Sequence, residues 1–498
     1  MSVKIIESSL VLWPLLTTLA APFIVLICGR NINLREGISF IAGTITFALV
    51  LSCAPTVLDG GILRYELFRI LPGITITFAM DGLGFIFAFI APFLWVLATS
   101  YNIGYMRSLN EHAQTRYYFC FAVAIFGAVG VALAANVFTL YLFYEIISVF
   151  TYPLVAHHQD EEGFEGARKY LVYLMGTSKL FLLPAMVLTY VLAGTLDFPL
   201  GDIHKGIFSP EVTAAHPDLV RLTYVLFIAG LAKAALMPFH NWLPSAMVAP
   251  TPVSALLHAV AVVKAGVFSV SRIILSGFGT DTMTSLGLSV PTAYVAAFTI
   301  VAASLIALTK DDIKARLAYS TVSQLSYVVI GVALAVPLSV QGGLLHIGHH
   351  AFSKITLFFG AGAIYVASHL KSIKKMNGLG RQMPLTFGAF GLASLSMIGM
   401  PPVCGFVSKW YLVNGALQQE QLILLIALLA STLLNAGYFV PIFYRAFFLA
   451  PDPAANIGQY KEAPLCMVIP LVLTSLVSVL LGFFPGLFQN FIRVFGGF

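Results

Sequence analysis

Long apolar segments separated by short polar connections recur along the whole chain. A helix that spans a membrane needs about 20 mainly apolar residues. Read with this length, the pattern predicts about fourteen spanning helices, at residues 8–28, 38–58, 81–103, 117–135, 138–156, 170–193, 222–248, 253–275, 291–309, 317–336, 342–368, 385–417, 421–448 and 465–489. The longest hydrophilic stretch, 194–221, is too short for a soluble domain. The pattern therefore predicts an all-α polytopic membrane protein.

The composition supports this fold class and excludes several others. Of the 498 residues, 59% are hydrophobic and 10% are charged, whereas about 25% of a soluble domain is charged. The five cysteines are scattered without the spacing of a metal or redox centre. The net charge of +6 comes from dispersed basic residues. We therefore expect no disulfide framework, no metal, no cofactor and no nucleic-acid partner.

The basic residues in the connections predict the orientation. They are concentrated in one set of alternating loops, which includes Arg30, Arg35, Arg107 and Arg116. The positive-inside rule places this set in the cytoplasm. We therefore expect a multi-pass protein of the cell (inner) membrane with both termini outside.

Several charged residues lie deep inside the apolar segments, namely Glu145, Lys179, Lys233, Lys264 and Lys354. A charge at the bilayer centre costs about 2.5–3.5 kcal/mol and usually marks an ion or proton pathway. Burial lowers the proton affinity of a lysine and a nearby carboxylate raises it, so a Lys–Glu pair of changing separation can bind and release a proton. Isolated charges held by polar neighbours are the alternative, but the number of such residues favours a relay. Lys179 is either an extra relay element or part of a local salt bridge.

Histidines accompany the lysine at 354. His346, His350 and Lys354 are spaced four residues apart, so one helical face carries three titratable groups over about 12 Å. The reference pKa of histidine, about 6.5, suits a proton carrier. A metal site would need further ligands, and no carboxylate or cysteine lies nearby in the sequence. His258 and Lys264 do not share a helical face, and His258 could extend the polar chain through water.

Two of the expected helices contain breaks. Pro238 and Pro244 follow Lys233, and the pair Pro401–Pro402 precedes Lys409. Proline breaks a helix, and non-helical backbone at membrane depth needs surrounding protein or a water-filled cavity. Interrupted helices at corresponding points of two halves indicate an inverted-repeat transporter.

At these residues the sequence resembles the antiporter-like family shared by respiratory complex I and the Mrp-type cation/proton antiporters. The resemblance runs from about Asp81 to Lys409 and is most specific in residues 238–268, 308–331, 346–364 and 399–410. It implies a fold of fourteen helices with two inverted five-helix repeats.

The resemblance also implies an organisation and roles. Three N-terminal helices (1–116) would precede the first repeat (117–275), the second repeat (291–448) and a C-terminal helix (465–498). The residues implied in proton translocation are an input pair, Glu145 and Lys233, a central relay of His258, Lys264, His346, His350 and Lys354, and an exit site, Lys409.

The function implied is that of a proton-translocating subunit of a multisubunit Mrp-type Na⁺/H⁺ antiporter, similar to the D type. The alternative is an M- or N-like pumping subunit of a complex I-like NADH-quinone oxidoreductase or membrane-bound hydrogenase. Partners would be the other membrane subunits, with protons and, in an antiporter, Na⁺ as transported ions. A quinone-reducing enzyme is disfavoured, because the sequence has no Gly-rich phosphate loop and no cysteine cluster. We expect no active site on this chain itself.

Overall fold

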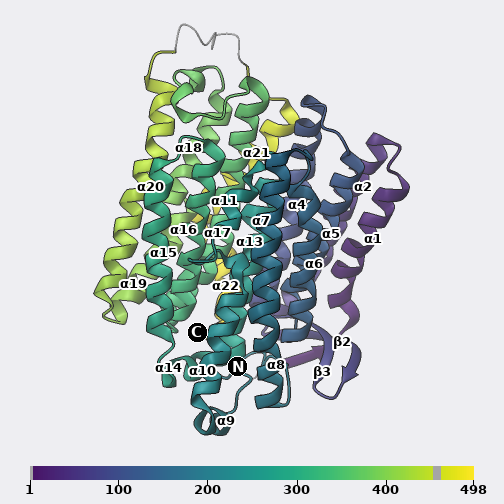
Figure 1. Ribbon diagram of the computed structural model, residues 1–498, viewed down its shortest axis with the longest axis vertical. Coiled ribbons are helices and arrows are strands. Elements are labelled where there is room, and N and C mark those ends of the chain that lie inside the picture. The colour runs from purple at the N-terminus through teal and green to yellow at the C-terminus, as the bar shows by residue number, and fades with distance from the viewer. Residues whose placement is uncertain (1–3, 452–460) are drawn as a thin grey trace.

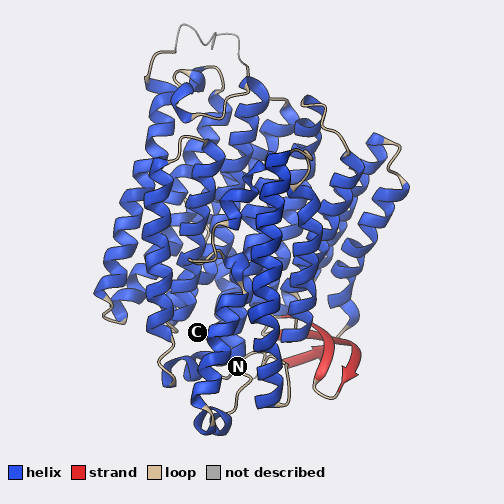
Figure 2. Ribbon diagram, viewed as in Figure 1, coloured by secondary structure: helices blue, strands red, loops and turns tan. Residues whose placement is uncertain are grey.

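The computed structural model describes residues 4–451 and 461–498, apart from the side chains of residues 258–260. Long helices lie side by side and make up most of the molecule, and both termini lie toward the same end of the helices (Figure 1). The all-α class expected from the apolar pattern is confirmed, with one small sheet added (Figure 2).

The N-terminal part forms the right-hand side of the molecule in Figure 1. Side-chain oxygens of Asn31, Asp81 and Asn136 accept hydrogen bonds from the first turns of three of its helices, which fixes where these helices begin. Its helices are η1 (Ser9–Leu12), α1 (Trp13–Ile27), α2 (Ile32–Ser52), α3 (Ala54–Leu58), α4 (Gly82–Ser108), α5 (Gln114–Ala132) and α6 (Val137–Val155).

A three-stranded sheet lies at the lower end of this part (Figure 2). Its strands are β1 (Lys4–Glu7), β2 (Gly61–Leu71) and β3 (Ile74–Met80). β1 pairs parallel with β2, and β2 pairs antiparallel with β3. The apolar pattern does not predict these strands, because β2 and β3 occupy a connection between two expected helices.

The middle of the chain contains the first broken segment. Its elements are α7 (Glu161–Thr177), η2 (Ser178–Leu182), α8 (Leu183–Ala193), α9 (Pro210–Ala215), α10 (Pro217–Gly230), η3 (Ala232–Ala234), α11 (Trp242–Ser245), η4 (Ala246–Val248), α12 (Thr251–Val253), η5 (Ser254–Ala261), α13 (Val262–Arg272), η6 (Ile273–Phe278) and α14 (Gly279–Ser285).

The remaining chain contains the second broken segment, between α18 and α19. Its elements are α15 (Ser289–Thr309), α16 (Ile313–Ala333), α17 (Pro337–Ser368), η7 (Ile373–Lys375), η8 (Leu379–Arg381), α18 (Pro384–Ile398), α19 (Cys404–Gln418), α20 (Leu422–Phe448), α21 (Leu465–Phe483) and α22 (Gly486–Gly496).

The number of spanning helices differs from the expected fourteen. Among the described residues, eleven helices are long and apolar enough to cross a membrane. The expected segments 222–248 and 385–417 are interrupted, so neither is one continuous span. The segment 317–336 forms most of α16, but this helix buries many hydroxyl and amide side chains.

Burial separates an inner set of helices from an outer one. α17 is buried along nearly its whole length and packs against α16, α18, α19 and α21. A Cβ atom on Gly331 of α16 would lie 2.5 Å from the Cα atom of Gly343 in α17, so glycine permits this close approach. Exposed large apolar side chains cover α1, α2, α20 and α21, as expected of helices that face lipid.

Candidate functional site

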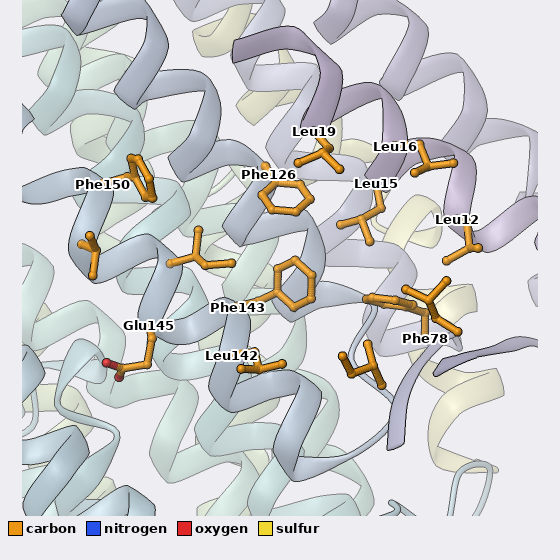
Figure 3. A pocket seen from close by; sticks show the side chains of 14 residues that line it. Leu12, Leu15, Leu16, Leu19, Phe78, Phe126, Leu142, Phe143, Glu145 and Phe150 are labelled. Carbon is orange, nitrogen blue, oxygen red and sulfur yellow. The ribbon is translucent and has the colours of Figure 1, made fainter. Parts of the chain in front are cut away.

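Glu145 lies in the middle of α6, at the edge of an apolar groove of about 520 Å³. In Figure 3 its carboxylate points away from Leu12, Leu16 and Phe78, which line the far side of this groove. One carboxylate oxygen accepts a hydrogen bond from the Ser178 hydroxyl. The structure thus gives the carboxylate polar partners on the side away from the groove.

The second oxygen of Glu145 forms an ion pair with Lys179. The Lys179 ammonium lies 2.7 Å from Glu145 Oε2 and 2.6 Å from the Tyr141 hydroxyl. The side chain of Lys179 is 47% exposed on the outer surface, whereas that of Glu145 is 13% exposed. Of the two roles expected for Lys179, the local salt bridge is therefore present, and it engages the expected input carboxylate.

Lys233 is fully buried in η3, directly after α10 ends. Its ammonium donates hydrogen bonds to the Tyr144 carbonyl and the Ser148 hydroxyl, each at 2.7 Å. It also lies 3.1 Å from the centre of the Tyr144 ring, an arrangement in which the π face attracts a cation. Glu145 interacts with Lys233 electrostatically, while Tyr144 supplies the direct contacts.

Close packing holds the break that carries Lys233. The indole N–H of Trp242 donates to the Ala232 carbonyl at 2.9 Å. Gly266 of α13 faces the same segment, and a Cβ atom there would lie 2.3 Å from the Lys233 carbonyl carbon. A residue without a side chain is therefore required where α13 crosses the broken segment.

The central residues lie on α13 and α17. Lys264 is fully buried, and its ammonium is among the buried groups without a hydrogen-bond partner in the described part of the chain. It interacts electrostatically with His346, His350 and Lys354. The rings of His346 and His350 lie with their centroids 5.9 Å apart. The structure therefore brings these four expected residues together.

His346 has a defined partner on each ring nitrogen. Nδ1 lies 2.9 Å from the Ser408 hydroxyl, and Nε2 lies 3.0 Å from the Gln324 side-chain oxygen. The amide nitrogen of Gln324 donates to the Met397 carbonyl at 3.3 Å. His346 is thus tied to α16 and to both halves of the second broken segment.

Lys354 connects to the same region by a second route. Its ammonium donates to the Ser320 hydroxyl at 2.8 Å, and the Tyr438 hydroxyl donates to the same oxygen at 3.0 Å. Tyr438 also contacts the side-chain oxygen of Asn435. The amide nitrogen of Asn435 then donates to the Met397 carbonyl at 3.2 Å.

Lys409 lies on α19 and returns toward the end of α18. Its ammonium donates to the carbonyls of Met397 and Ile398, at 2.7 and 3.1 Å. These are C-terminal carbonyls of a helix, which lack intrahelical partners and carry partial negative charge. Gly399 turns the chain there with a φ of +94°, and a Cβ atom on it would lie 2.7 Å from the Lys409 side chain.

One expected residue, His258, and one further histidine of α17, His349, are not part of this network of described side chains. The side chain of His258 lies outside the described residues, so its proposed contribution has no structural description. His349 is fully buried on the other face of α17, with both ring nitrogens among the buried atoms that lack hydrogen-bond partners in the described part.

Sequence reasoning missed the neutral members of the site, namely Tyr144, Ser148, Ser320, Gln324, Ser408, Asn435 and Tyr438. Tyr144 is adjacent to Glu145, and Ser408 is adjacent to Lys409, so proximity to a buried charge could have identified these two. Polar side chains are common along the other helices, and the pattern alone does not distinguish those that face Lys354 or His346.

The sequence matches a known family and is similar to named members of respiratory and antiporter complexes. The family described as "NADH:quinone oxidoreductase/Mrp antiporter, TM" matches residues 134–435, which include every expected site residue. NADH-quinone oxidoreductase subunit N of Desulforudis audaxviator is 31% identical over 95% of each chain. A probable K⁺/H⁺ antiporter chain of Rhizobium meliloti, of the A/B type, is 30% identical over 91% of this chain. This chain spans 45% of that longer relative.

Solved structures agree on the fold. A chain of the Mrp complex from Dietzia sp. DQ12-45-1b superposes with a TM-score of 0.85 at 21% identity, covering 98% of this chain and 96% of that one. A chain of the archaeal membrane-bound sulfane sulfur reductase gives the same TM-score at 23% identity, covering 98% and 97%. This multi-pass membrane protein therefore belongs to the NADH:quinone oxidoreductase/Mrp antiporter transmembrane family.

Proposed function

We propose that the chain is the proton-translocating subunit of a multisubunit membrane complex. The observation that carries the proposal is a set of buried protonatable side chains: Lys233 and Lys409 lie at the two breaks in the helices, and Lys264, His346, His350 and Lys354 lie together on α13 and α17. The residues proposed to carry protons are Glu145, Lys233, Lys264, His258, His346, His350, Lys354 and Lys409. The two breaks would correspond in inverted repeats, with both termini outside the cytoplasm.

The input step would exchange the partner of one carboxylate. Glu145 pairs directly with Lys179 in this conformation and acts on Lys233 through space. When Glu145 leaves Lys179 and approaches Lys233, the ammonium form of Lys233 gains stability, so the neutral amine of Lys233 takes up a proton. Return of the carboxylate to Lys179 would favour release of that proton toward Lys264.

The exit step would use the network between Lys354 and Lys409. The Ser320 hydroxyl accepts from Lys354 and could pass a proton to the Tyr438 hydroxyl. Since the next contact is the Asn435 amide, the proton would have to reach Lys409 from Tyr438 through water. The Asn435 amide and the Met397 carbonyl would instead position Lys409 relative to the central residues. A change in the protonation of Lys354 would therefore alter the position of Lys409 through these contacts.

We infer an Mrp-type Na⁺/H⁺ antiporter as the first candidate assembly, and its other membrane subunits as partners. A complex I-like redox-driven pump is the second. The relative named as subunit N, which matches over nearly the full length of both chains, favours this second candidate. The two differ in what drives proton movement, so one experiment separates them.

The test measures proton flux in inverted vesicles that contain the whole complex. Glu145→Gln and Lys233→Met are compared with wild type after a Na⁺ pulse and, separately, after addition of NADH. Glu165→Gln and Lys205→Met serve as matched controls, because both side chains are exposed and each pairs with a neighbour three or four residues away. All four variants must assemble to the same level.

Loss of Na⁺-driven flux in both site variants, with the controls active, supports the antiporter. Loss of NADH-driven flux supports the redox pump. Normal flux in Glu145→Gln and Lys233→Met under both drives would refute a relay through these residues, and the buried charges would then be structural.

A further inference from the structure

Two connections at one end of the helices bring histidines and a glutamate together. Glu111 and His112 lie between α4 and α5, and His157 follows the end of α6. One potential ligand atom from each of these three residues lies within 4.8 Å of the others. The connection between α4 and α5 thereby meets the connection between α6 and α7.

Two distances to the Glu111 carboxylate approach the separation of ligands around a small cation. His157 Nε2 lies 3.5 Å from Glu111 Oε2, and His158 Nδ1 lies 3.7 Å from the same oxygen. In a tetrahedral zinc site with bonds of 2.0–2.2 Å, neighbouring ligand atoms are about 3.3–3.6 Å apart. Small rotations of these side chains would complete such a geometry.

The burial of His157 is the second observation that points to a ligand. Its side chain is fully buried, its Nδ1 has no hydrogen-bond partner within the described residues, and its Nε2 faces the Glu111 carboxylate at 3.5 Å without hydrogen-bond geometry. Burying a polar group without a partner destabilises a protein, so such a group usually has a ligand. The backbone around it is held in place, since Arg116 donates to the His157 carbonyl at 3.1 Å and the Tyr117 ring packs edge-on against the imidazole.

We propose that Glu111, His112 and His157 bind one divalent cation of the zinc class, with His158 or water as the fourth ligand. Imidazole and carboxylate ligands suit this class of metal. The ion would link the two connections and so fix the adjoining ends of α5 and α6, the helix that carries Glu145. The site is separate from the proposed relay, and its existence does not depend on the proposed function.

The sequence does not reveal this cluster, because Glu111 and His157 are 46 positions apart in the chain (157 minus 111). The expectation of no metal rested on cysteine spacing and on the histidines of α17. Neither observation concerns the loops that contain Glu111 and His157.

The experiment measures Zn²⁺ and Co²⁺ binding to the purified whole complex, stripped of metal with a chelator. Equilibrium dialysis counts Zn²⁺, and the visible absorption of Co²⁺ reports a tetrahedral site with nitrogen and oxygen ligands. Variants are Glu111→Gln, His157→Gln and His112→Gln. His216→Gln, an exposed histidine preceding α10, is the control.

Wild type and His216→Gln are expected to bind one more Zn²⁺ per complex than Glu111→Gln or His157→Gln. His112 is exposed, so His112→Gln should fold normally and bind at least ~10-fold more weakly. Equal stoichiometry and affinity in wild type and His112→Gln would overturn the proposal, as would Co²⁺ spectra that do not change in any variant. Proton flux is not part of the readout, so failure here and failure of the relay are distinguishable.

Discussion

The close contact between α13 and the first broken segment provides a sharp test of how Lys233 is positioned. In Gly266→Ala, the new Cβ atom would lie 2.3 Å from the Lys233 carbonyl carbon and 2.3 Å from the Ala234 nitrogen. Ordinary contact begins at 3.4 Å, so the two segments must separate by about 1.1 Å. Both contacts are with backbone atoms, which cannot rotate away.

The cost of this displacement can be bounded. Overpacking of one methyl group in a dense interior costs about 1–3 kcal/mol, which outweighs the gain of about 1 kcal/mol from replacing glycine by alanine in a helix. The ammonium of Lys233 is held by two hydrogen bonds of 2.7 Å. A shift of about 1 Å stretches them beyond the usual range, and misplacement of this size can reduce rates by about 100-fold.

The assay compares proton flux and thermal unfolding of the assembled complex in Gly266→Ala and Gly176→Ala. Gly176 lies in α7, and a methyl group added there would have no other atom within 4 Å, so its variant should keep full flux and wild-type or higher stability. Gly266→Ala should lose at least ~10-fold in flux. Equal flux in the two variants would show that the contact at Gly266 does not position Lys233.

Three further predictions concern other contacts. Lys179→Met removes the direct partner of Glu145 and should reduce proton flux by about tenfold; an unchanged flux in the vesicle assay contradicts the partner exchange. Asp81 and Arg272 form a buried ion pair with contacts of 2.5 and 2.8 Å. Asp81→Leu leaves the arginine buried without its partner and should lower the free energy of unfolding by about 3–5 kcal/mol, whereas the double variant with Arg272→Leu should lower it less. Denaturant titration of the complex measures both changes, and a larger loss in the double variant, equal to the sum of the two single losses, would contradict the prediction. Burial raises the pKa of Asp311, but hydrogen bonds and nearby cations outweigh it and hold the pKa below the usual 3.8. This stabilisation is present above pH 3.8 and is lost as the pH falls through the folded-state pKa, so the drop in melting temperature caused by Asp311→Asn should shrink below that pH, and a constant drop would refute the assignment.

The charged residues and the breaks could be predicted from the sequence because each violates a strong rule. A lysine at the centre of an apolar helix, as at 233 or 354, is costly in a membrane. Prolines beside Lys233 and Lys409 interrupt the helical hydrogen bonds. Such violations are visible one residue at a time, and the structure places Lys233 and Lys354 fully inside the protein.

The partners of these charges could not be predicted, because they depend on how neighbouring helices are rotated. Tyr144 contacts Lys233 through its carbonyl, its hydroxyl and its ring. No periodicity in the sequence predicts these three contacts. The difference between the fourteen expected spans and the eleven long apolar helices of the described residues has, at α16, a related reason. α16 is less apolar than its neighbours because it carries buried polar side chains. Among them, Ser320 hydrogen-bonds Lys354 and Gln324 contacts His346 in the interior.

The carbonyl oxygen of Met397 receives three donors, from Lys409, Asn435 and Gln324, at 2.7, 3.2 and 3.3 Å. A carbonyl oxygen has two lone pairs, so the three donors compete and the oxygen stays satisfied when any one departs. Departure of Lys409 would therefore leave the Met397 carbonyl paired, whereas the Ile398 carbonyl, which Lys409 also contacts at 3.1 Å, would lose its donor. Of the three donors, the Lys409 ammonium makes the shortest contact and carries the charge. The two amides would keep the Met397 carbonyl at the end of α18 hydrogen-bonded while the lysine is away, so the acceptor stays in place for its return.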